Sequence, residues 1–377
     1  MARWLGLLLP LFGFACTESH DPQAAAAQSS AAQQSCVGCH GSRQPGLLAT
    51  WNAGAHARNE VRCEDCHGAD HEAMFRAEGR VPAEVCGRCH AAQTEEFLAS
   101  VHGRAHDDAT ANPLFLAQIP AVQRQACLGC HDTGPKTGRC DGCHLAHRFS
   151  VEEARQPEAC GMCHCGPDHP QLEAFALSKH GVVWAATHDE NQAPTCVTCH
   201  MKGTHDASRG LTRGRAAHGA VAAGESPPVP MQIFDPARIE RERETMLGRC
   251  DACHMRRLSQ RALGDADRIK RHADELVAEA VRIVEGLYRD GLLDPMPEER
   301  IAHPTAGHAF APAAAFENQS DPERLLFFFV QFAHSITFKS AYHQSPDYLQ
   351  WHGIASLKSQ LDELRAVERR IRQRRDG

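Results

Sequence analysis

Cysteine and histidine recur along this chain in one fixed order, Cys-x-x-Cys-His, which appears eight times. Random placement of the same composition would give roughly 0.06 such matches, so the repeat reflects selection for a chemical task. The cysteine pairs are Cys36 and Cys39, Cys63 and Cys66, Cys86 and Cys89, Cys127 and Cys130, Cys140 and Cys143, Cys160 and Cys163, Cys196 and Cys199, and Cys250 and Cys253. The histidines that follow them are His40, His67, His90, His131, His144, His164, His200 and His254.

Two thiols at this spacing add across the vinyl groups of a haem, and the histidine that follows becomes the proximal iron ligand. Zinc sites or disulfides are the alternative, but zinc does not need a histidine directly after every second cysteine. The repeat therefore predicts eight covalently attached haem c groups. It uses 16 of the 18 cysteines and leaves Cys16 and Cys165.

The composition suits a chain that wraps cofactors. Hydrophobic residues make up 42% of the chain, which argues against disorder, but aromatic residues make up only 6%, so a conventional core would be thin. Stacked haems would supply the missing interior. We therefore expect a mainly α-helical fold with extensive loops, a multihaem cytochrome c core and a C-terminal bundle of long helices. With 40 basic against 47 acidic residues, the charge gives no sign of nucleic-acid binding.

The first residues predict export. Residues 1–15 read as a signal peptide, because Arg3 is followed by the apolar run Trp4–Phe14, which is too short to span a bilayer. Haem c attachment takes place outside the bacterial cytoplasm, so we expect a periplasmic protein. Cys16 stands where a bacterial lipoprotein is cleaved and lipidated, although leucine is usual in place of Gly13, and cleavage nearby without a lipid is the alternative. Residues 16–34 would form a flexible tether.

The rest of the chain divides into two regions. Residues 35–256 hold all eight motifs and would form an octahaem domain, with Ser208–Pro230 as a long surface loop. Residues 257–377 show helical periodicity. It predicts helices over Leu258–Leu292, broken by Gly264, over Pro322–Gln344, and over Pro346–Arg374 with Ser345 as N-cap.

Three features of the C-terminal region have simple structural interpretations. The apolar stripe is expected to pack in a core and consists of Leu357, Leu361, Leu364, Val367 and Ile371. The run Leu325–Phe332 is too short to cross a membrane and is expected to be buried. The basic run Arg369–Arg375 is expected to be a solvated helix end.

The spare histidines supply the second axial ligands. Subtracting eight proximal histidines from 25 leaves 17. A low-spin electron-transfer haem takes one more ligand, whereas a catalytic haem keeps that position open. The spare histidines near the motifs, which we expect to cap haems, are His56, His71, His102, His147, His180 and His205. A seventh cap could be His188, His218 or His272, and the sequence does not distinguish them.

Three stretches resemble the octahaem hydroxylamine oxidoreductase family. The first is Cys140–Ser150, with the letters CDGCHLAHRFS, which leads closely into the sixth motif. The second starts at Cys160 with CGMCHCGPDHPQLE and continues to SKHG at Ser178–Gly181. The third consists of two segments, FEN from Phe316 and HQSPDYLQWHG at His343–Gly353. With eight motifs, the resemblance covers most of residues 35–377.

The resemblance implies a catalytic fourth haem with no distal protein ligand, held here by Cys127, Cys130 and His131. It implies that Asp168 and His169 line the distal pocket as an acid–base pair. Family members that oxidise hydroxylamine carry a tyrosine from a neighbouring subunit of a trimer, cross-linked to the catalytic haem, and Tyr348 is favoured over Tyr342 for that role. The chain is shorter than a typical member, which favours reduction over oxidation.

The sequence therefore favours an enzyme that converts small nitrogen compounds. Hydroxylamine oxidation, or reduction of nitrite, nitric oxide or hydroxylamine, would take place at the open fourth haem, while the other haems exchange electrons with a periplasmic or membrane redox partner. The main alternative is an electron-transfer cytochrome in which every iron has two ligands and His169 is one of them. A further alternative is an octahaem sulfur-compound (tetrathionate) reductase, because Cys165 stands directly after a motif histidine. The alternative interpretation of Cys165 is a buried, unreactive cysteine.

The mature N-terminus tests the export and lipidation hypothesis. We expect mass spectrometry of the protein purified from membranes to find a chain that begins at Cys16 and carries a lipid. A mature chain with an unmodified Cys16 would reject the anchor, and a chain that retains residues 1–15 would reject the signal peptide.

Overall fold

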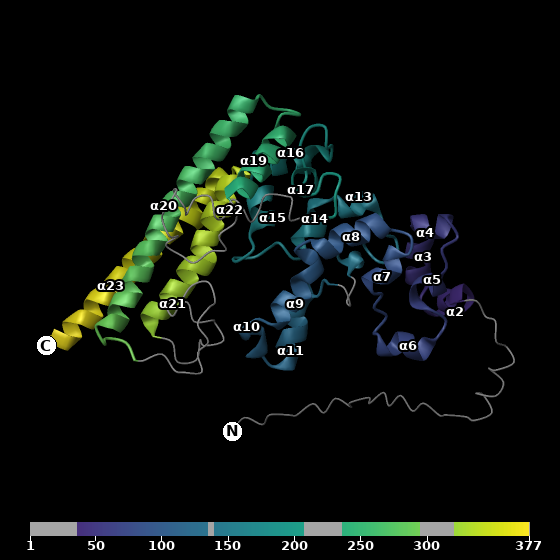
Figure 1. The fold of residues 1–377 in the computed structure, drawn as a ribbon, viewed down its shortest axis with the longest axis horizontal. Coiled ribbons are helices and arrows are strands. Elements are labelled where there is room, and N and C mark those ends of the chain that lie inside the picture. Colours follow the sequence, from purple (N-terminus) through teal and green to yellow (C-terminus); the bar gives the residue numbers. More distant parts are fainter. Residues whose placement is uncertain (1–35, 135–138, 207–235, 295–319, 377) are drawn as a thin grey trace, which may run out of the picture.

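This computed structural model describes residues 36–134, 139–206, 236–294 and 320–376. Within these ranges the secondary structure is helical and contains no strand, which confirms the mainly α-helical prediction. Figure 1 shows short helices of the motif-bearing half on one side and long helices of the C-terminal half on the other. The predicted signal peptide, Cys16, the tether and the loop Ser208–Pro230 lie outside the described residues.

The motif-bearing half is a succession of short helices joined by turns. In chain order they are α2 (Cys36–Arg43), α3 (Pro45–Ala53), α4 (Ala55–Arg58), α5 (Cys63–His67), α6 (His71–Arg76), α7 (Ala83–Gly87), α8 (Ala91–Ala99), η1 (His102–Arg104), α9 (Ala105–Thr110), α10 (Pro113–Leu116), α11 (Pro120–Val122), η2 (Gln123–Cys127), α12 (Leu128–His131), η3 (Cys140–Gly142), α13 (Val151–Ala154), α14 (Pro157–Gly161), α15 (Gln171–Ala176), α16 (Lys179–Thr187) and α17 (Cys196–His200).

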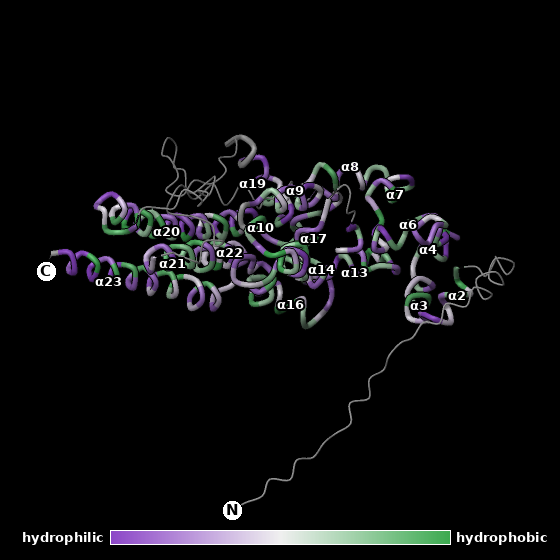
Figure 2. Tube along the Cα trace, turned by 90° about the horizontal axis from the view of Figure 1, so that it is seen from below, coloured by the Kyte–Doolittle hydropathy of each residue, from purple (hydrophilic) through white to green (hydrophobic). Residues whose placement is uncertain are grey.

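Local sequence explains why these helices are short. A proline opens α3, α11 and α14, where its missing N–H costs nothing. The Asp70 carboxylate caps α6, and the Ser178 hydroxyl caps α16. Figure 2 shows polar and apolar residues interleaved along this half. The cluster of buried apolar side chains here is small and centres on Phe175 and Trp184.

The C-terminal half begins with the helix that leads into the eighth motif, and its helical elements join into longer runs. They are α19 (Pro236–Cys250), α20 (Arg256–Arg289), α21 (Asp321–Phe328), η7 (Phe329–His334), α22 (Ser335–His343), η8 (Tyr348–Ala355) and α23 (Ser356–Asp376). η7 and η8 are π-helical segments, and η7 joins α21 to α22 without a break. Helix α20 packs against α21, α22 and α23.

The main hydrophobic core lies between these long helices. On α20 the buried residues recur three or four positions apart and include Ala273, Val277, Ala280 and Val284. They pack against Leu326 and Phe329 and against the stripe of α23. Leu357, Leu361 and Leu364 are at most 1% exposed, which confirms the prediction that the stripe is core. Every helix in the described ranges is too short or too polar to cross a membrane.

Three helix predictions need correction. Gly264 does not break its helix, because α20 runs continuously from Arg256 to Arg289. A helical glycine costs only about 1 kcal/mol, which the burial of its neighbours offsets. Ser345 precedes the last helix as predicted, but its hydroxyl makes no hydrogen bond, so the expected side-chain cap is wrong. Leu325–Phe332 is buried on one side only, since Phe328 is 37% exposed.

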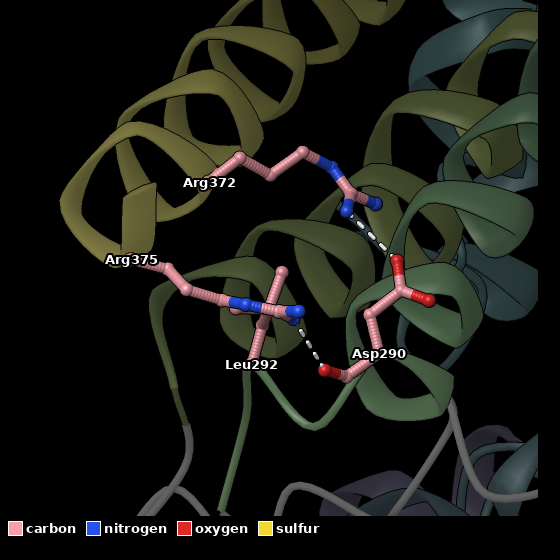
Figure 3. A pocket seen from close by; sticks show the side chains of 4 residues that line it. All are labelled: Asp290, Leu292, Arg372 and Arg375. Atoms are coloured by element: carbon pink, nitrogen blue, oxygen red, sulfur yellow. Dashed lines mark hydrogen bonds and ion pairs between the residues drawn. The ribbon is translucent and has the colours of Figure 1, made fainter. Parts of the chain in front are cut away.

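Two arginines at the basic end of α23 form hydrogen bonds with Asp290 at the end of α20. Figure 3 shows the Arg372 guanidinium facing the Asp290 carboxylate and Arg375 facing the Asp290 carbonyl, both at the end of α20. The two distances are 2.7 Å and 2.8 Å. Arg369, Arg370 and Arg374 are exposed, as expected of a solvated helix end.

Replacing Leu361 with alanine tests the role of this core. Because the side chain is 1% exposed, we expect Leu361→Ala to lower the free energy of unfolding by about 2 to 5 kcal/mol, measured by denaturant titration with circular dichroism. Lys358→Ala, on the exposed side of the same helix, is the matched control. Equal midpoints for the two variants would contradict the assignment.

Candidate haem sites

Each of the eight motif histidines has a second histidine ring facing it. The pairs are His40 with His71, His67 with His147, His90 with His56, His131 with His169, His144 with His205, His164 with His102, His200 with His343, and His254 with His180. The two ring centroids are between 5.9 Å and 6.4 Å apart in every pair.

This separation suits an iron ion between two imidazoles. With about 2 Å from metal to each nitrogen, the two ring centroids of a bis-imidazole complex lie about 6 Å apart. The same narrow range of distances recurs in all eight pairs, although the planes of the two rings differ in tilt from 24° to 84°. The donor set therefore fits haem c, with the motif cysteines as attachment points and the paired histidines as axial groups.

The six histidines predicted as caps all face motif histidines. Of the three candidates for a seventh cap, the two that the structure describes face other groups. His188 packs against Trp184, His272 lies beside Glu275, and His218 is outside the described residues. The ring opposite His200 is instead His343, at the end of α22. Sequence proximity could not find it, because it comes from the C-terminal helices. The only signal was its place in the stretch that resembles the enzyme family.

A repeated nine-residue pattern positions two of the caps. Residues 95–103 and 173–181 share the order Glu-x-Phe-x-x-Ser-x-His-Gly. In both copies the serine hydroxyl accepts the amide N–H of the glycine, from Gly103 at 3.3 Å and from Gly181 at 3.1 Å. A Cβ on Gly181 would lie 2.1 Å from the Phe175 carbonyl oxygen, so only glycine allows this close turn. The sequence analysis missed this pattern.

Burial keeps the most enclosed of these imidazoles neutral. It lowers the pKa of His164 to about 4 and the pKa of His343 to about 4. Metal ligation requires the neutral form. His343 also donates its Nδ1 proton to the Lys339 carbonyl at 2.7 Å, which leaves Nε2 as the lone-pair nitrogen.

Electrostatic interactions between motif cysteines show which motifs are neighbours in space. The neighbouring thiols are Cys36 and Cys63, Cys66 and Cys86, Cys86 and Cys140, Cys143 and Cys160, Cys160 and Cys196, and Cys199 and Cys250. The first, second, third, fifth, sixth, seventh and eighth motifs thus form one series. The fourth joins it at the sixth, because the Cys163 sulfur lies 3.8 Å from the Cys130 carbonyl oxygen.

The histidine that faces the fourth motif is bonded to a neighbouring carboxylate. The π-helical turn η2 leads into α12, which carries His131. The ring of His169 faces it with 6.3 Å between centroids. His169 Nδ1 lies 2.8 Å from the Asp168 carboxylate, whereas the corresponding distance from His205 to Glu96 is 3.8 Å. The carboxylate therefore bonds Nδ1 and leaves Nε2 for the side of the motif.

Several hydrogen bonds hold the loop that carries Asp168 and His169. The Gly166 amide donates to the Glu173 carboxylate at 2.8 Å, and the Leu172 amide donates to the His164 carbonyl at 2.9 Å. From α22, the Ser335 hydroxyl and the Lys339 ammonium both donate to the Asp168 carbonyl. Burial lowers the pKa of Lys339 to about 8, with the opposing effects of Asp168 and Glu173 smaller, so the side chain stays protonated at neutral pH.

Cys165 lies in this loop and is exposed, so the expectation of a buried cysteine is wrong. Desolvation, and then the neighbouring Glu173, raise the pKa of its thiol. A raised pKa disfavours the nucleophilic thiolate, so this observation supports the unreactive interpretation over sulfur chemistry.

The three tyrosines are in different surroundings. The Tyr342 hydroxyl donates to Asp267 at 2.8 Å, and the Tyr288 hydroxyl donates to Glu323. Tyr348, on η8, is half-buried and lies near Glu173 of α15. Burial is the larger cause that raises the pKa of the Tyr348 hydroxyl, and the Glu173 carboxylate is the smaller one. Tyr348 thus lies beside the helix that follows the distal pair.

Comparison with known proteins identifies two matching family profiles. The family described as "Seven times multi-haem cytochrome CxxCH" matches residues 108–300, and "Cytochrome c554 and c-prime" matches residues 15–68.

Curated relatives come from two bacteria. A probable nitrite reductase-hydroxylamine oxidoreductase fusion protein of Kuenenia stuttgartiensis is 26% identical over 91% of this chain and 52% of its own length. The chain therefore spans about half the length of that relative. A high-molecular-weight cytochrome c of Nitratidesulfovibrio vulgaris is 28% identical over 32% of this chain and 18% of its own length.

Solved structures share the fold. The reducing HAO-like protein complex of Kuenenia stuttgartiensis matches with a TM-score of 0.72 and 25% identity, over 95% of this chain and 88% of that chain. A hypothetical multiheme protein matches with the same TM-score, 0.72, at 18% identity, over 96% of this chain and 100% of that one. The second likeness concerns the fold alone.

Replacing His343 tests the position that the structure added to the sequence analysis. If His343 caps the seventh haem, His343→Ala will convert that haem from low-spin to high-spin and add one equivalent of carbon monoxide binding to the reduced protein. His352→Ala, an exposed histidine on η8, is the matched control. Identical spectra for the two variants would show that His343 is not a ligand.

Proposed function

The chain belongs to the seven-times multihaem CxxCH cytochrome family, and we propose that it is an octahaem oxidoreductase that converts small nitrogen compounds at its fourth motif. The observation that carries this proposal is the Asp168–His169 pair facing His131. It is supported by the likeness, over nearly the whole chain, to a complex whose name describes it as reducing and HAO-like.

The reaction needs a proton source, and this pair suits that task. Interconversion of nitrite, nitric oxide, hydroxylamine and ammonia moves protons together with electrons. An imidazole is the side chain best suited to pass protons near neutral pH, and the Asp168 carboxylate, 2.8 Å from His169 Nδ1, holds the His169 ring in orientation. His169 would pass a proton from Nε2 to a substrate held opposite His131, and Asp168 would keep Nδ1 protonated throughout.

Haem c at His131, with its distal position open to exchange, would supply the redox chemistry. The seven other histidine pairs suit electron conduction, because a haem with two protein ligands has no place for substrate. The fourth motif adjoins the sixth, which is Cys160–His164. Electrons would therefore pass through the sixth motif between the fourth motif and the series formed by the other motifs. Eight attached haems remain part of this proposal.

We favour reduction as the direction. The relatives described as a nitrite reductase fusion and as reducing support it. Oxidation would be favoured if Tyr348 formed a cross-link to the catalytic haem across a trimer interface. Its location near Glu173 is compatible with such a role, whereas the Tyr342 hydroxyl already bonds Asp267. Single unlinked subunits in the intact-mass spectrum would exclude the cross-link.

Export completes the proposal. We place the mature protein in the bacterial periplasm, with lipid on Cys16 as its anchor and a periplasmic or membrane protein as its redox partner. Multihaem c-type cytochromes are typically exported, which supports this location. The division into a domain over residues 35–256 and a helical region over residues 257–377 also stays a prediction. His343 shows, however, that the second region reaches into the motif-bearing half.

A specific distance supports a second function. His131 and His169 are 6.3 Å apart, the same spacing as the seven other pairs. A carboxylate that bonds the far nitrogen of a histidine is also a common support for a metal ligand. If His169 binds the fourth iron permanently, the protein is an electron-transfer cytochrome with every iron six-coordinate.

Replacing Asp168 with asparagine separates the two functions. The change keeps the shape of the side chain and removes its charge. We expect Asp168→Asn to lower kcat for nitrite or hydroxylamine by about 10²- to 10⁴-fold, the usual contribution of acid–base catalysis, with a smaller change in KM. Asp189→Asn is the control, because Asp189 accepts hydrogen bonds in a turn in the same way but away from the fourth motif. Full turnover in Asp168→Asn would reject the catalytic role.

A further inference from the structure

Two side chains of helix α22 contact the backbone of the distal pair Asp168–His169. The Ser335 hydroxyl donates to the Asp168 carbonyl at 2.9 Å, and the Lys339 ammonium donates to the same oxygen at 2.6 Å. Ser335 and Lys339 are four residues apart, so they lie on one side of the helix. Both of these hydrogen bonds to the Asp168 carbonyl therefore come from side chains of α22.

These two donors fix the residue that orients His169. The Asp168 carboxylate bonds His169 Nδ1, so the place of the Asp168 backbone determines where the imidazole stands relative to His131. Ser335 and Lys339 bond the Asp168 carbonyl and not the ring of His169. Their influence on it would act through Asp168.

Helix α22 is itself held in register by α20. At its start, His334 bonds the Asp274 carboxylate at 2.7 Å, and Lys270 bonds the same carboxylate at 2.7 Å and 2.8 Å. At its end, the Tyr342 hydroxyl bonds Asp267 at 2.8 Å. Asp267 and Asp274 are two helical turns apart and face the same way. Two attachment points prevent α22 from sliding or rotating against α20.

The first attachment is deeply buried. Lys270 is 0% exposed, Asp274 3% and His334 5%. Removing one member of such a group leaves an unpaired buried charge, so the three side chains hold one another in place. The helical bundle therefore has a defined geometry next to the fourth motif, at a place where a hydrophobic interface alone would allow small shifts.

We propose that Ser335 and Lys339 are positioning residues that set the distance between His169 and the fourth motif, with the α20–α22 contacts as their rigid support. This inference rests on the proposed function for its catalytic consequence. It assigns a task to the C-terminal bundle, whose other contribution is His343. Lys339 serves both, because its side chain holds Asp168 and its carbonyl accepts the His343 proton.

The test uses Ser335→Ala and Lys339→Met in the full haem-loaded protein. The His343 partner is preserved, because the backbone carbonyl remains. A displaced imidazole would change the fourth haem's electron paramagnetic resonance component, which is identified as the one that His169→Ala alters. We expect both variants to change that component and to lower kcat by about tenfold to 10²-fold, with KM changed less. Lys339→Arg should restore much of the loss.

Thr337→Val is the matched control. Thr337 is buried on the same helix, but its hydroxyl bonds the Ala333 carbonyl within the helix. The proposal is overturned if Ser335→Ala and Lys339→Met leave the fourth-haem component as it is in Thr337→Val. It is also overturned if all haem components change together and Lys339→Arg restores nothing, because that result indicates a general loss of structure. If Lys339→Met does not fold, the fourth-haem component of Ser335→Ala alone decides the test.

Failure of the proposed function would be seen separately. If the wild-type protein neither binds carbon monoxide nor turns over nitrite or hydroxylamine, the fourth haem is a conductor and the proposed reaction is wrong. The positioning inference is then judged by the spectrum alone, since Ser335 and Lys339 would still set the geometry of the His131–His169 pair. A changed component in both variants supports it, and an unchanged one rejects it.

Discussion

The spacing between facing histidines is the constraint on which the rest of this structure depends. Eight pairs of rings lie 5.9 Å to 6.4 Å apart, and most of them are carried by the short helices and turns of the motif-bearing half. Such a half needs few large apolar side chains, which agrees with its small cluster around Phe175 and Trp184. The larger core belongs to the C-terminal helices, where α20 and α23 bury their apolar stripes.

The two halves meet where chemistry is proposed. Helix α22 brings His343 to the seventh motif and holds the Asp168 carbonyl beside the fourth. The buried contacts of α22 with α20 therefore influence both an electron-transfer position and the distal pair. The π-helical segments η7 and η8 flank α22, and η2 precedes the fourth motif. Such segments occur often at functional sites, because they shift side chains without ending the helix.

Local information in the sequence predicted much of this arrangement, and non-local information was out of reach. The motif cysteines and histidines follow from spacing alone, and nearness to a motif led to the six predicted caps, which are His56, His71, His102, His147, His180 and His205. His343 comes from the far end of the chain, and only tertiary packing brings it to His200. The predicted break at Gly264 was wrong, because burial along α20 outweighs a weak local preference. The Ser345 hydroxyl has no partner although its position is typical of a cap. The roles of Asp168 and His169 came from family resemblance, since a histidine next to a carboxylate also occurs in turns.

Carbon monoxide binding tests the central claim most directly. Carbon monoxide requires a ferrous haem without a permanent sixth ligand, so the difference spectrum of the fully reduced protein counts open irons. The account predicts binding equivalent to one haem in the whole protein, lost when Cys127 and Cys130 are replaced so that the fourth haem is not attached. Absence of binding would show that His169 occupies the fourth iron and that the protein only conducts electrons.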